Sequence, residues 1–384
     1  MTHSFILIDT QPTLETFCRR IESERWLAID TEFVRTDTYF PQLCLIQIQS
    51  EGGQAAIIDP LTLSDLSPLW RLLAAPNCIK VFHSARQDLE VLYQLSGALP
   101  SPIFDTQIAG VFLGYGDLAG LAKVVKGELG RVLEKDQTRT DWSRRPLSDQ
   151  QLTYAIDDVR TLAPIYERFL ARLTDAEQKA LEEDFEALLS ESLYRPSPET
   201  AGDKLKMAGK LARKNKAIAY RLAEWRELYA INHNKPKRWV LSDDALIDIA
   251  KRPPQTPQAL YKVPNIKASS VKNFGDEWIA LIDEVFAHPE HWPETEPKEP
   301  PPSAQEDILL NIAFALLQQT ALDYGINPNN IANRTQLLQL IRQPDSGLSG
   351  WRHLLLGQPL CRFLQGQSSL SCQSQRIIQK TFMP

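Results

Sequence analysis

Short strand-like and helix-like segments alternate over residues 1 to about 170, and no convincing strand pattern follows Thr174. The strand-like segments are rich in Ile, Val and aromatic residues and are bounded by turn residues; they are Phe5–Ile8, Trp26–Asp30, Cys44–Gln49, Ala55–Ile58 and Ile79–His83. Segments with the apolar spacing of helices are Leu14–Glu24, Leu66–Leu73, Gln87–Leu95 and Ser148–Leu170. We therefore expect an α/β domain with a mixed sheet, followed by all-α modules.

Composition divides the chain further. Residues 288–304 are rich in Pro and Glu, as in stiff linkers, and they separate two helical stretches. The tail after Gly366 is rich in Ser and Gln with little apolar pattern, and we expect it to fray. The predicted limits are 1–172 for the α/β domain, 173–204 for a connecting helix and linker, 205–287 for a helical domain, 288–304 for the second linker, and 305–384 for a smaller helical domain.

The cysteines and the apolar pattern indicate the compartment. The five cysteines are odd in number and have no CxxC spacing, which suits a reducing cytosol better than a disulfide framework or a zinc site. No apolar run is long enough to span a bilayer, and residues 1–4 do not begin a secretory signal. We expect a cytoplasmic protein that binds no membrane and acts as a monomer.

Charge is segregated along the chain. The formal net charge of −6, taken alone, argues against nucleic-acid binding. Residues 204–238, however, hold eleven Lys or Arg against two Glu, a local net charge of +9, whereas residues 175–191 hold seven acids and one Lys. Considered alone, the basic stretch fits a solvated helical face better than a phosphate-binding surface, so its function depends on other features.

Asp30 and Glu32 are two acids one residue apart at the end of the apolar run Trp26–Ile29. Alternate residues of a strand project to the same side of a sheet, so both carboxylates would lie together beside a hydrophobic core. Uncompensated carboxylates are costly there. A bound cation is the simplest compensation. The pair is strong evidence for a cation site only if further acids lie close to it.

Two further acids and a tyrosine extend this set. Asp88 follows Ile79–His83 in the first turn of a helix, where an acid also serves as favourable N-terminal charge. Tyr154 and Asp158 are four residues apart and share one face of a helix, and their neighbours on that face are apolar. Asp157 points elsewhere and suits a surface position. Asp158 is therefore out of place unless it has a partner.

One α/β domain can bring these four carboxylates together. Clustered carboxylates repel and raise each other's pKa unless a cation compensates. Oxygen ligands without a Cys or His cluster select Mg²⁺ or Mn²⁺ over zinc. Two such ions about 3.5–4 Å apart serve attack on a phosphodiester, and a tyrosine hydroxyl can orient the attacking water. The residues therefore indicate phosphodiester hydrolysis with two divalent cations.

Three segments resemble the motifs of the DEDD 3′-5′ exonucleases, in the tyrosine branch: Asp30–Phe33, His83–Asp88 and Tyr154–Asp158. Phe104–Ala109 and Asp141–Ser148 are similar to the ribonuclease D family in particular. The resemblance implies a ribonuclease H-like fold and a catalytic set in which Tyr154 orients the water and the metal ligands are Asp30, Glu32, Asp88 and Asp158. Thr153 occupies the position of the histidine in the other branch, which excludes that branch.

Three other residues near these motifs are interpreted as structural. Asp105 and Asp141 match family positions outside the catalytic set, and His83 fits a packed histidine at a strand end better than a general base.

Residues 215–286 resemble the HRDC domain, which ribonuclease D shares with RecQ-type helicases, through Leu222–Ala230, Asn234–Leu241 and Asp243–Ala250. Residues 305–384 are more loosely similar to a second HRDC-like unit. The expected RNA contacts are the exposed basic residues of the 234–241 turn, namely Lys235, Lys237 and Arg238. Contacts of this kind with phosphates would position RNA without reading its sequence.

By this resemblance the protein is expected to be a 3′-5′ exoribonuclease that trims tRNA precursors and other small structured RNAs to nucleoside 5′-monophosphates. A DNA-directed 3′-5′ exonuclease is an alternative, because helicase-linked relatives carry both kinds of module, although the sequence has no helicase P-loop motif. An inactive RNA-binding scaffold is a second alternative. A binding protein, however, has no need of a repulsive carboxylate cluster. The preferred RNA, and the choice between Mg²⁺ and Mn²⁺, are not determined by the sequence.

Overall fold

The computed structural model describes residues 5–133, 140–294, 300–344 and 347–382. They form two compact units that interleave along the chain. The first unit contains the chain up to Phe33, Leu43–Leu193 and the C-terminal segment from Pro300 onward; the second contains Val34–Gln42 and the chain from Tyr194 to the 288–304 linker. Among the helices of the described residues, none combines the length and the apolar character needed to span a membrane.

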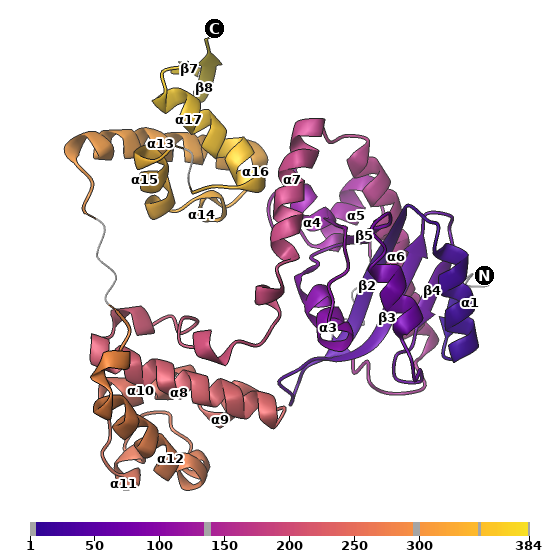
Figure 1. Cartoon of the computed structure of the whole chain (residues 1–384). Coiled ribbons are helices and arrows are strands. Elements are labelled where there is room, and N and C mark those ends of the chain that lie inside the picture. Colours follow the sequence, from indigo (N-terminus) through magenta and orange to yellow (C-terminus); the bar gives the residue numbers. More distant parts are fainter. Residues whose placement is uncertain (1–4, 134–139, 295–299, 345–346, 383–384) are drawn as a thin grey trace. The chain divides into compact units, whose positions relative to one another are not determined.

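A six-stranded mixed sheet forms the centre of the first unit (Figure 1). Its strands, in order across the sheet, are β1 (Ile6–Ile8), β4 (Ala55–Ile58), β3 (Gln42–Ser50), β2 (Trp26–Val34), β5 (Ile79–Phe82) and β6 (Ile103–Asp105). β4 pairs with β1 in parallel and with β3 antiparallel, and β5 pairs in parallel with β2 and β6. The expected mixed sheet is therefore confirmed.

Two strands differ from the prediction. β2 continues to Val34, so that Asp30 and Glu32 lie within the strand and not at its end. Polar residues in the middle of a strand conceal its continuation from a reading that follows apolar runs. β6 was not predicted, because it has three residues and follows Pro102 directly. Tertiary pairing with β5, and not local propensity, makes this segment a strand.

Helices flank this sheet (Figure 1). They are α1 (Gln11–Ile21), α2 (Ser67–Leu73), α3 (Arg86–Ser96), α4 (Thr106–Ala109), α5 (Leu121–Leu129), α6 (Asp149–Leu170), α7 (Asp175–Leu188) and the short η1 (Glu191–Leu193). A capping box between Ser148 and Gln151 starts α6 by satisfying free backbone amides. Burial of the α6 face that includes Ala155, Ile156 and Val159 fixes the rotation of this helix.

The C-terminal segment packs against the α/β part of the first unit. Its elements are α13 (Ala304–Tyr324), α14 (Pro328–Ile331), α15 (Arg334–Arg342), α16 (Gly350–Arg352), the π-turn η5 (His353–Gly357), α17 (Gln358–Leu364), β7 (Ser368–Gln373) and β8 (Arg376–Thr381). On α7, Glu183 Oε2 accepts a hydrogen bond from Gly350 N (2.8 Å), and Asp184 Oδ2 accepts one from Trp351 N (2.9 Å). Gly350 has a φ of +55°, and a Cβ there would collide with the Asp184 carboxylate. The contact therefore requires glycine at this position.

The predicted all-α character of this segment and the predicted fraying of its tail are wrong. Residues after Gly366 form a two-stranded antiparallel hairpin, β7–β8. Ser374 and Gln375, at its turn, both have positive φ, 51° and 64°, as in a tight hairpin turn that follows the twist of the strands. Leu370 and Ile377 pack on the core of the segment, and this burial orders a tail whose Ser and Gln residues hide its strand pattern.

The second unit is a helical bundle. Its elements are η2 (Pro198–Thr200), η3 (Ala208–Lys210), α8 (Arg213–Asn232), α9 (Lys237–Val240), α10 (Asp243–Lys251), α11 (Pro257–Leu260), α12 (Ala268–Ala287) and η4 (Pro289–His291). Trp278 is fully buried, and its ring meets that of Trp225 edge-on at 5.8 Å between centroids. The segment Val34–Gln42 joins this unit because Asn234 Oδ1 accepts hydrogen bonds from Tyr39 N and Phe40 N, both at 3.0 Å.

Candidate active site

Strand β2 carries the first two acids of the predicted site. Asp30 and Glu32 alternate along β2 and so project to the same side of the sheet. Thr31 between them is buried, and its hydroxyl donates a hydrogen bond to Asp88 Oδ1. One strand therefore supplies two carboxylates and also orients a third.

Helix α6 adds Asp158 to this pair. Single carboxylate oxygens of Asp30, Glu32 and Asp158 all lie within 4.8 Å of one another. Asp88, buried in the first turn of α3, lines the same cleft. The structure thus brings the four predicted acids into one cleft and places three of them within reach of a single ion.

The protein environment disfavours the charged forms of these acids. Burial raises the pKa of Asp30 to about 7. Burial, with repulsion from Asp30 and then Asp158, raises the pKa of Glu32 to about 9. Burial, with repulsion chiefly from Asp30, raises the pKa of Asp158 to about 8, and the same two causes hold the pKa of Asp88 well above its usual range. Without a compensating cation the cluster therefore retains protons near neutral pH.

This donor set fits divalent cations. Carboxylate oxygens are the ligands that Mg²⁺ and Mn²⁺ prefer in proteins, and a cation beside them favours the ionised state that burial opposes. The oxygens lie close enough to share one ion. The burial and repulsion that raise the pKa values are the costs that a bound cation would offset.

Tyr154 lies one helical turn before Asp158 and lines the same cleft. Its ring centroid is 6.1 Å from that of Trp142, which is 2 % exposed. The cleft has a volume of about 610 Å³, and its wall also includes Phe33 and Leu121. A cleft of this size, lined by carboxylates and by aromatic and aliphatic side chains, can accept a nucleotide.

The sequence did not single out Thr31 or Trp142 as parts of the site. Arg145 holds the segment that carries Trp142: its Nη1 donates to Trp142 O at 2.7 Å, and its Nη2 donates to Asp59 Oδ1 at 2.8 Å. The available signal was the resemblance of Asp141–Ser148 to family sequences, which marks the segment without assigning a role to each residue.

Contacts support the structural interpretation of three other residues. The nitrogens of His83 lie 2.9 Å from Thr106 Oγ1 and 2.9 Å from Ala119 O, and burial lowers the pKa of its imidazole. Asp105 is buried and accepts hydrogen bonds from backbone amides, including Ala85 N at 2.8 Å. Asp141 accepts one from the Ser143 hydroxyl at 2.6 Å.

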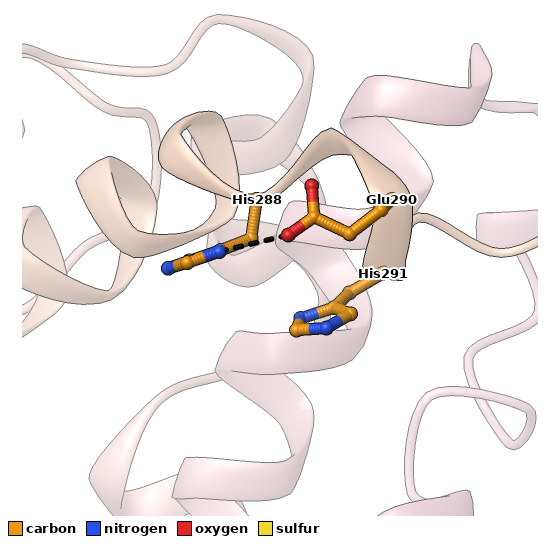
Figure 2. A group of neighbouring side chains, drawn as sticks. All are labelled: His288, Glu290 and His291. Carbon is orange, nitrogen blue, oxygen red and sulfur yellow. Dashed lines mark hydrogen bonds and ion pairs between the residues drawn. The ribbon is translucent and has the colours of Figure 1, made fainter.

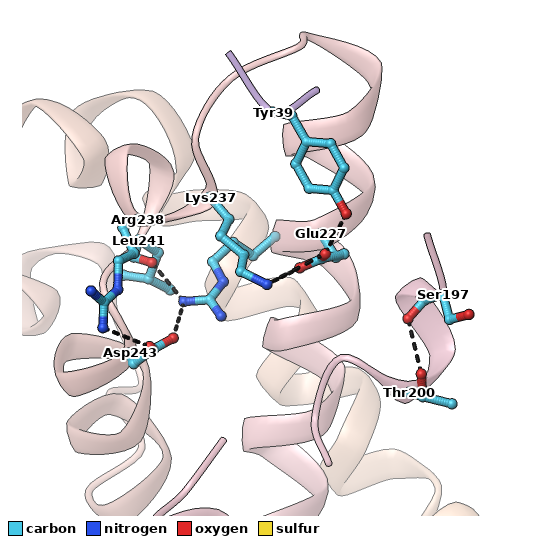
Figure 3. A network of polar contacts seen from close by, with 9 residues as sticks. Tyr39, Ser197, Thr200, Glu227, Lys237, Arg238, Leu241 and Asp243 are labelled. Atoms are coloured by element: carbon cyan, nitrogen blue, oxygen red, sulfur yellow. Dashed lines mark hydrogen bonds and ion pairs between the residues drawn. The ribbon is translucent and has the colours of Figure 1, made fainter. Parts of the chain in front are cut away.

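The predicted RNA-contacting residues Lys235, Lys237 and Arg238 lie in the second unit. Figure 3 shows two of them, Lys237 and Arg238, each beside an acid. Lys237 Nζ lies 3.2 Å from Glu227 Oε2, and the Tyr39 hydroxyl donates to Glu227 Oε1 at 2.6 Å. Since the Glu227 side chain is only 4 % exposed, this pair stabilises the fold.

The other two residues of the turn are more open to solvent. Arg238 Nη2 lies 3.3 Å from Asp243 Oδ2, and the Arg238 side chain is 75 % exposed. Lys235 is exposed, and Trp239, which the sequence did not single out, is 55 % exposed. The exposed part of the turn thus combines positive charge with an aromatic ring.

Comparisons with known proteins match both regions. A family described as 3′-5′ exonuclease matches residues 5–174, and the HRDC domain family matches residues 215–282. The ribonuclease D of Pseudomonas paraeruginosa is 35% identical over 358 residues, which cover 91% of this chain and 94% of that protein. The ribonuclease D of a Jannaschia species is 35% identical over 384 residues, covering 96% of this chain and 98% of that protein.

Solved structures agree with these matches. The crystal structure of Escherichia coli RNase D, described as an exoribonuclease involved in structured RNA processing, aligns with a TM-score of 0.77 at 30% identity, covering 94% of this chain and 99% of that one. The catalytic core of Trypanosoma brucei RRP6 aligns with a TM-score of 0.56 at 23% identity over 75% of this chain and 81% of that one, and shows the fold alone. The predicted fold class, a mixed-sheet exonuclease domain followed by a helical HRDC region, is confirmed.

Proposed function

The chain belongs to the ribonuclease D family, and from this membership we propose that it hydrolyses RNA from the 3′ end and releases nucleoside 5′-monophosphates. The observation that carries the proposal is the convergence of Asp30, Glu32 and Asp158 in a cleft that also contains Asp88 and Tyr154. Hydrolysis of a phosphodiester requires an activated water and a stabilised leaving oxygen, and this set of side chains can serve both needs.

Each residue has a role that follows from its position. Asp30, Glu32, Asp88 and Asp158 would hold two divalent cations, Mg²⁺ or Mn²⁺. Such ions supply the positive charge that activates water and stabilises the leaving oxygen. The Tyr154 hydroxyl, one turn from Asp158, would orient the attacking water. Thr31 would fix the Asp88 carboxylate through its hydrogen bond.

The proposed substrates are the 3′ ends of tRNA precursors and other small structured RNAs. The second unit would bind the RNA body through its exposed basic turn. Lys235 and Arg238 would contact phosphates, and the exposed ring of Trp239 offers a surface on which a base can stack. Lys237 would contribute less to RNA binding, because Glu227 already neutralises its charge.

The domain limits 1–172, 173–204, 205–287, 288–304 and 305–384 are proposed together with a monomeric state and a cytoplasmic location. Cys18, Cys44, Cys78, Cys361 and Cys372 are all free thiols, as is usual in a reducing compartment. Limited proteolysis that cuts first within 288–304, and a molecular mass in solution equal to one chain, would support the limits and the monomer.

The decisive test is a gel of 3′-extended tRNA incubated with the full chain in Mg²⁺ or Mn²⁺, with and without EDTA. We expect stepwise shortening from the 3′ end that EDTA abolishes. Single-stranded DNA of the same sequence, added as a competitor, separates an RNA enzyme from the DNA-directed alternative. RNA that is bound but never shortened under any metal condition would instead indicate the inactive scaffold.

A further inference from the structure

Two histidines and a glutamate meet on the surface of the second unit, far along the chain from the carboxylate cleft. One ligand atom from each of His288, Glu290 and His291 lies within 4.8 Å of the others, and all three side chains are exposed (Figure 2). We propose that these residues form a second metal site, which binds a divalent transition ion that prefers imidazole nitrogen, Zn²⁺ in particular.

The backbone that carries these residues is fixed by its own contacts. Helix α12 ends at Ala287, and the following turn η4 places His288, Glu290 and His291 close together. Trp292, directly after the turn, packs against the helical core and donates from Nε1 to Val285 O at 2.8 Å. Arg213 Nε donates to Pro293 O at 3.1 Å. The donors therefore project from an ordered turn, which lowers the cost of ordering them around an ion.

The donor chemistry selects the ion. Two imidazoles and one carboxylate form a common ligand set of Zn²⁺, whereas Mg²⁺ and Mn²⁺ prefer oxygen donors. This set therefore differs in kind from the all-carboxylate set of Asp30, Glu32 and Asp158.

The present geometry is close to what a shared ion needs. His288 Nδ1 lies 2.9 Å from Glu290 Oε1, and the two imidazole rings are stacked with centroids 5.4 Å apart. Ligands on a tetrahedral Zn²⁺ with bonds of about 2.0–2.1 Å lie about 3.3 Å from each other. Exposed side chains can rotate the remaining distance, because no core packing restrains them.

The surroundings favour a cation. His288 and His291 line a pocket of about 250 Å³ together with three acids, Glu199, Glu224 and Glu284. Arg221 is the single basic residue of that lining, and it pairs with both Glu224 (3.3 Å) and Glu284 (3.1 Å). The described lining is thus net negative, which attracts a divalent ion. A bound ion would fasten the start of the 288–304 linker to the end of α12.

Calorimetric titration of Zn²⁺ into the full chain tests the site. The protein is first stripped with a chelator and then kept in excess Mg²⁺, which competes with Zn²⁺ for carboxylate oxygens but competes poorly at imidazoles. We expect saturable binding of one equivalent of Zn²⁺. Loss of an outer-sphere partner already lowers metal affinity about 10–100-fold, so loss of the ligand in His291→Ala should weaken binding at least about tenfold.

His288→Ala should have the same effect as His291→Ala. His233→Ala is the matched control, because His233 is also an exposed histidine of the second unit and lies outside the cluster. Far-UV circular dichroism confirms that each variant is folded, as expected for exposed positions. The proposal is overturned if the wild-type chain shows no saturable Zn²⁺ binding in Mg²⁺, or if His291→Ala binds Zn²⁺ as tightly as the wild type.

Discussion

The carboxylate cleft and the basic turn of the helical unit differ in how their charges are compensated. In the cleft, Asp30, Glu32 and Asp158 lie close together; burial raises the pKa values of all three, and repulsion raises those of Glu32 and Asp158 further. In the basic turn, Lys237 lies beside the buried Glu227, whereas Arg238 lies beside Asp243 and remains 75 % exposed. Like charges that are held close together indicate a ligand of the opposite charge. A charge that is already neutralised by a buried partner indicates a structural role.

This contrast changes how the two sets are ranked. From sequence alone, the eleven basic residues of 204–238 fit a solvated helical face better than a phosphate-binding surface, and the chain offers no way to tell which of them are paired. The structure shows that part of this charge is neutralised within the fold, so that Lys237 counts toward stability more than toward RNA. In the cleft, proximity strengthens the signal of the acids, because Asp30, Asp158 and Asp88 together raise the pKa of Glu32.

The substitution expected to change activity most is Asp158→Asn. If the cleft is the cutting site, this substitution removes a metal ligand and should lower kcat by about 10³-fold. Asp157→Asn is the matched control, since it removes the adjacent acid of the same helix, and it should retain most activity. Rates of 3′-end shortening of single-stranded RNA measure both. Near wild-type activity in Asp158→Asn would show that the cleft is not the site of hydrolysis.

Tyr154→Phe deletes one hydroxyl and leaves the ring beside Trp142 in place. If the hydroxyl orients the attacking water, kcat should fall by about 100-fold with KM nearly unchanged. Single-turnover kinetics, together with KM, separate this effect from a change in RNA binding. A rise in KM at constant kcat would show that Tyr154 holds the RNA and does not orient the water.

The raised pKa values predict the pH dependence of stability in cation-free protein. A carboxyl whose pKa is higher in the folded state binds more protons there, so the free energy of unfolding is greatest below the unfolded pKa, near 4, and falls as pH rises through about 7 to 9. Asp158→Asn should flatten this decline and stabilise the protein at pH 8 by roughly 1–3 kcal/mol. Urea unfolding at pH 5 and pH 8 in EDTA measures both.

Added Mg²⁺ should restore stability to the wild type at pH 8, because the ion compensates the ionised carboxylates. If Asp158→Asn is less stable than the wild type at pH 8 in EDTA, the carboxylates do not repel one another as described.

The smallest effects distinguish three residues of the basic turn. Lys237→Met should lower the free energy of unfolding by about 1–2 kcal/mol, because it leaves the buried Glu227 without its cation. Lys235→Met should leave stability unchanged and raise KM for RNA a few-fold. If Lys237→Met weakens RNA binding and leaves the free energy of unfolding unchanged, Lys237 does not have the structural role that its pairing with Glu227 indicates.

Trp239→Ala should raise KM about tenfold if a base stacks on this ring. Tyr261→Ala is its control, because Tyr261 is exposed to a similar extent, 52 % compared with 55 % for Trp239.

Sequence predicted most of the fold and the acidic set for identifiable reasons. Strands such as Ala55–Ile58 are continuous apolar runs, and Ser148 with Gln151 is a recognisable helix start. The acids carried their own signal, since a buried face rarely tolerates an Asp such as Asp158 without compensation.

What the sequence could not give depends on contacts between distant residues. Thr31 joins the site through a hydrogen bond to Asp88, 57 positions away, and Trp142 through a segment held by Arg145. The β7–β8 hairpin gains its order from packing of Leu370 and Ile377 on the C-terminal core. Likewise, the neutralisation of Lys237 becomes visible only when Glu227, ten positions earlier, is seen to be buried beside it.

The hydrogen bonds from Gly350 and Trp351 to α7 have a consequence for how the chain is made. Glu183 and Asp184 are synthesised 167 residues before their partners, and the part of the second unit that begins at Tyr194 is synthesised in between. In a nascent chain the two acids of α7 therefore remain without these partners until Gly350 and Trp351 have been synthesised, whereas all strands of the six-stranded sheet are already present. A chain that terminates just before Gly350 would contain the four acids of the cleft but would leave Glu183 and Asp184 without these two partners.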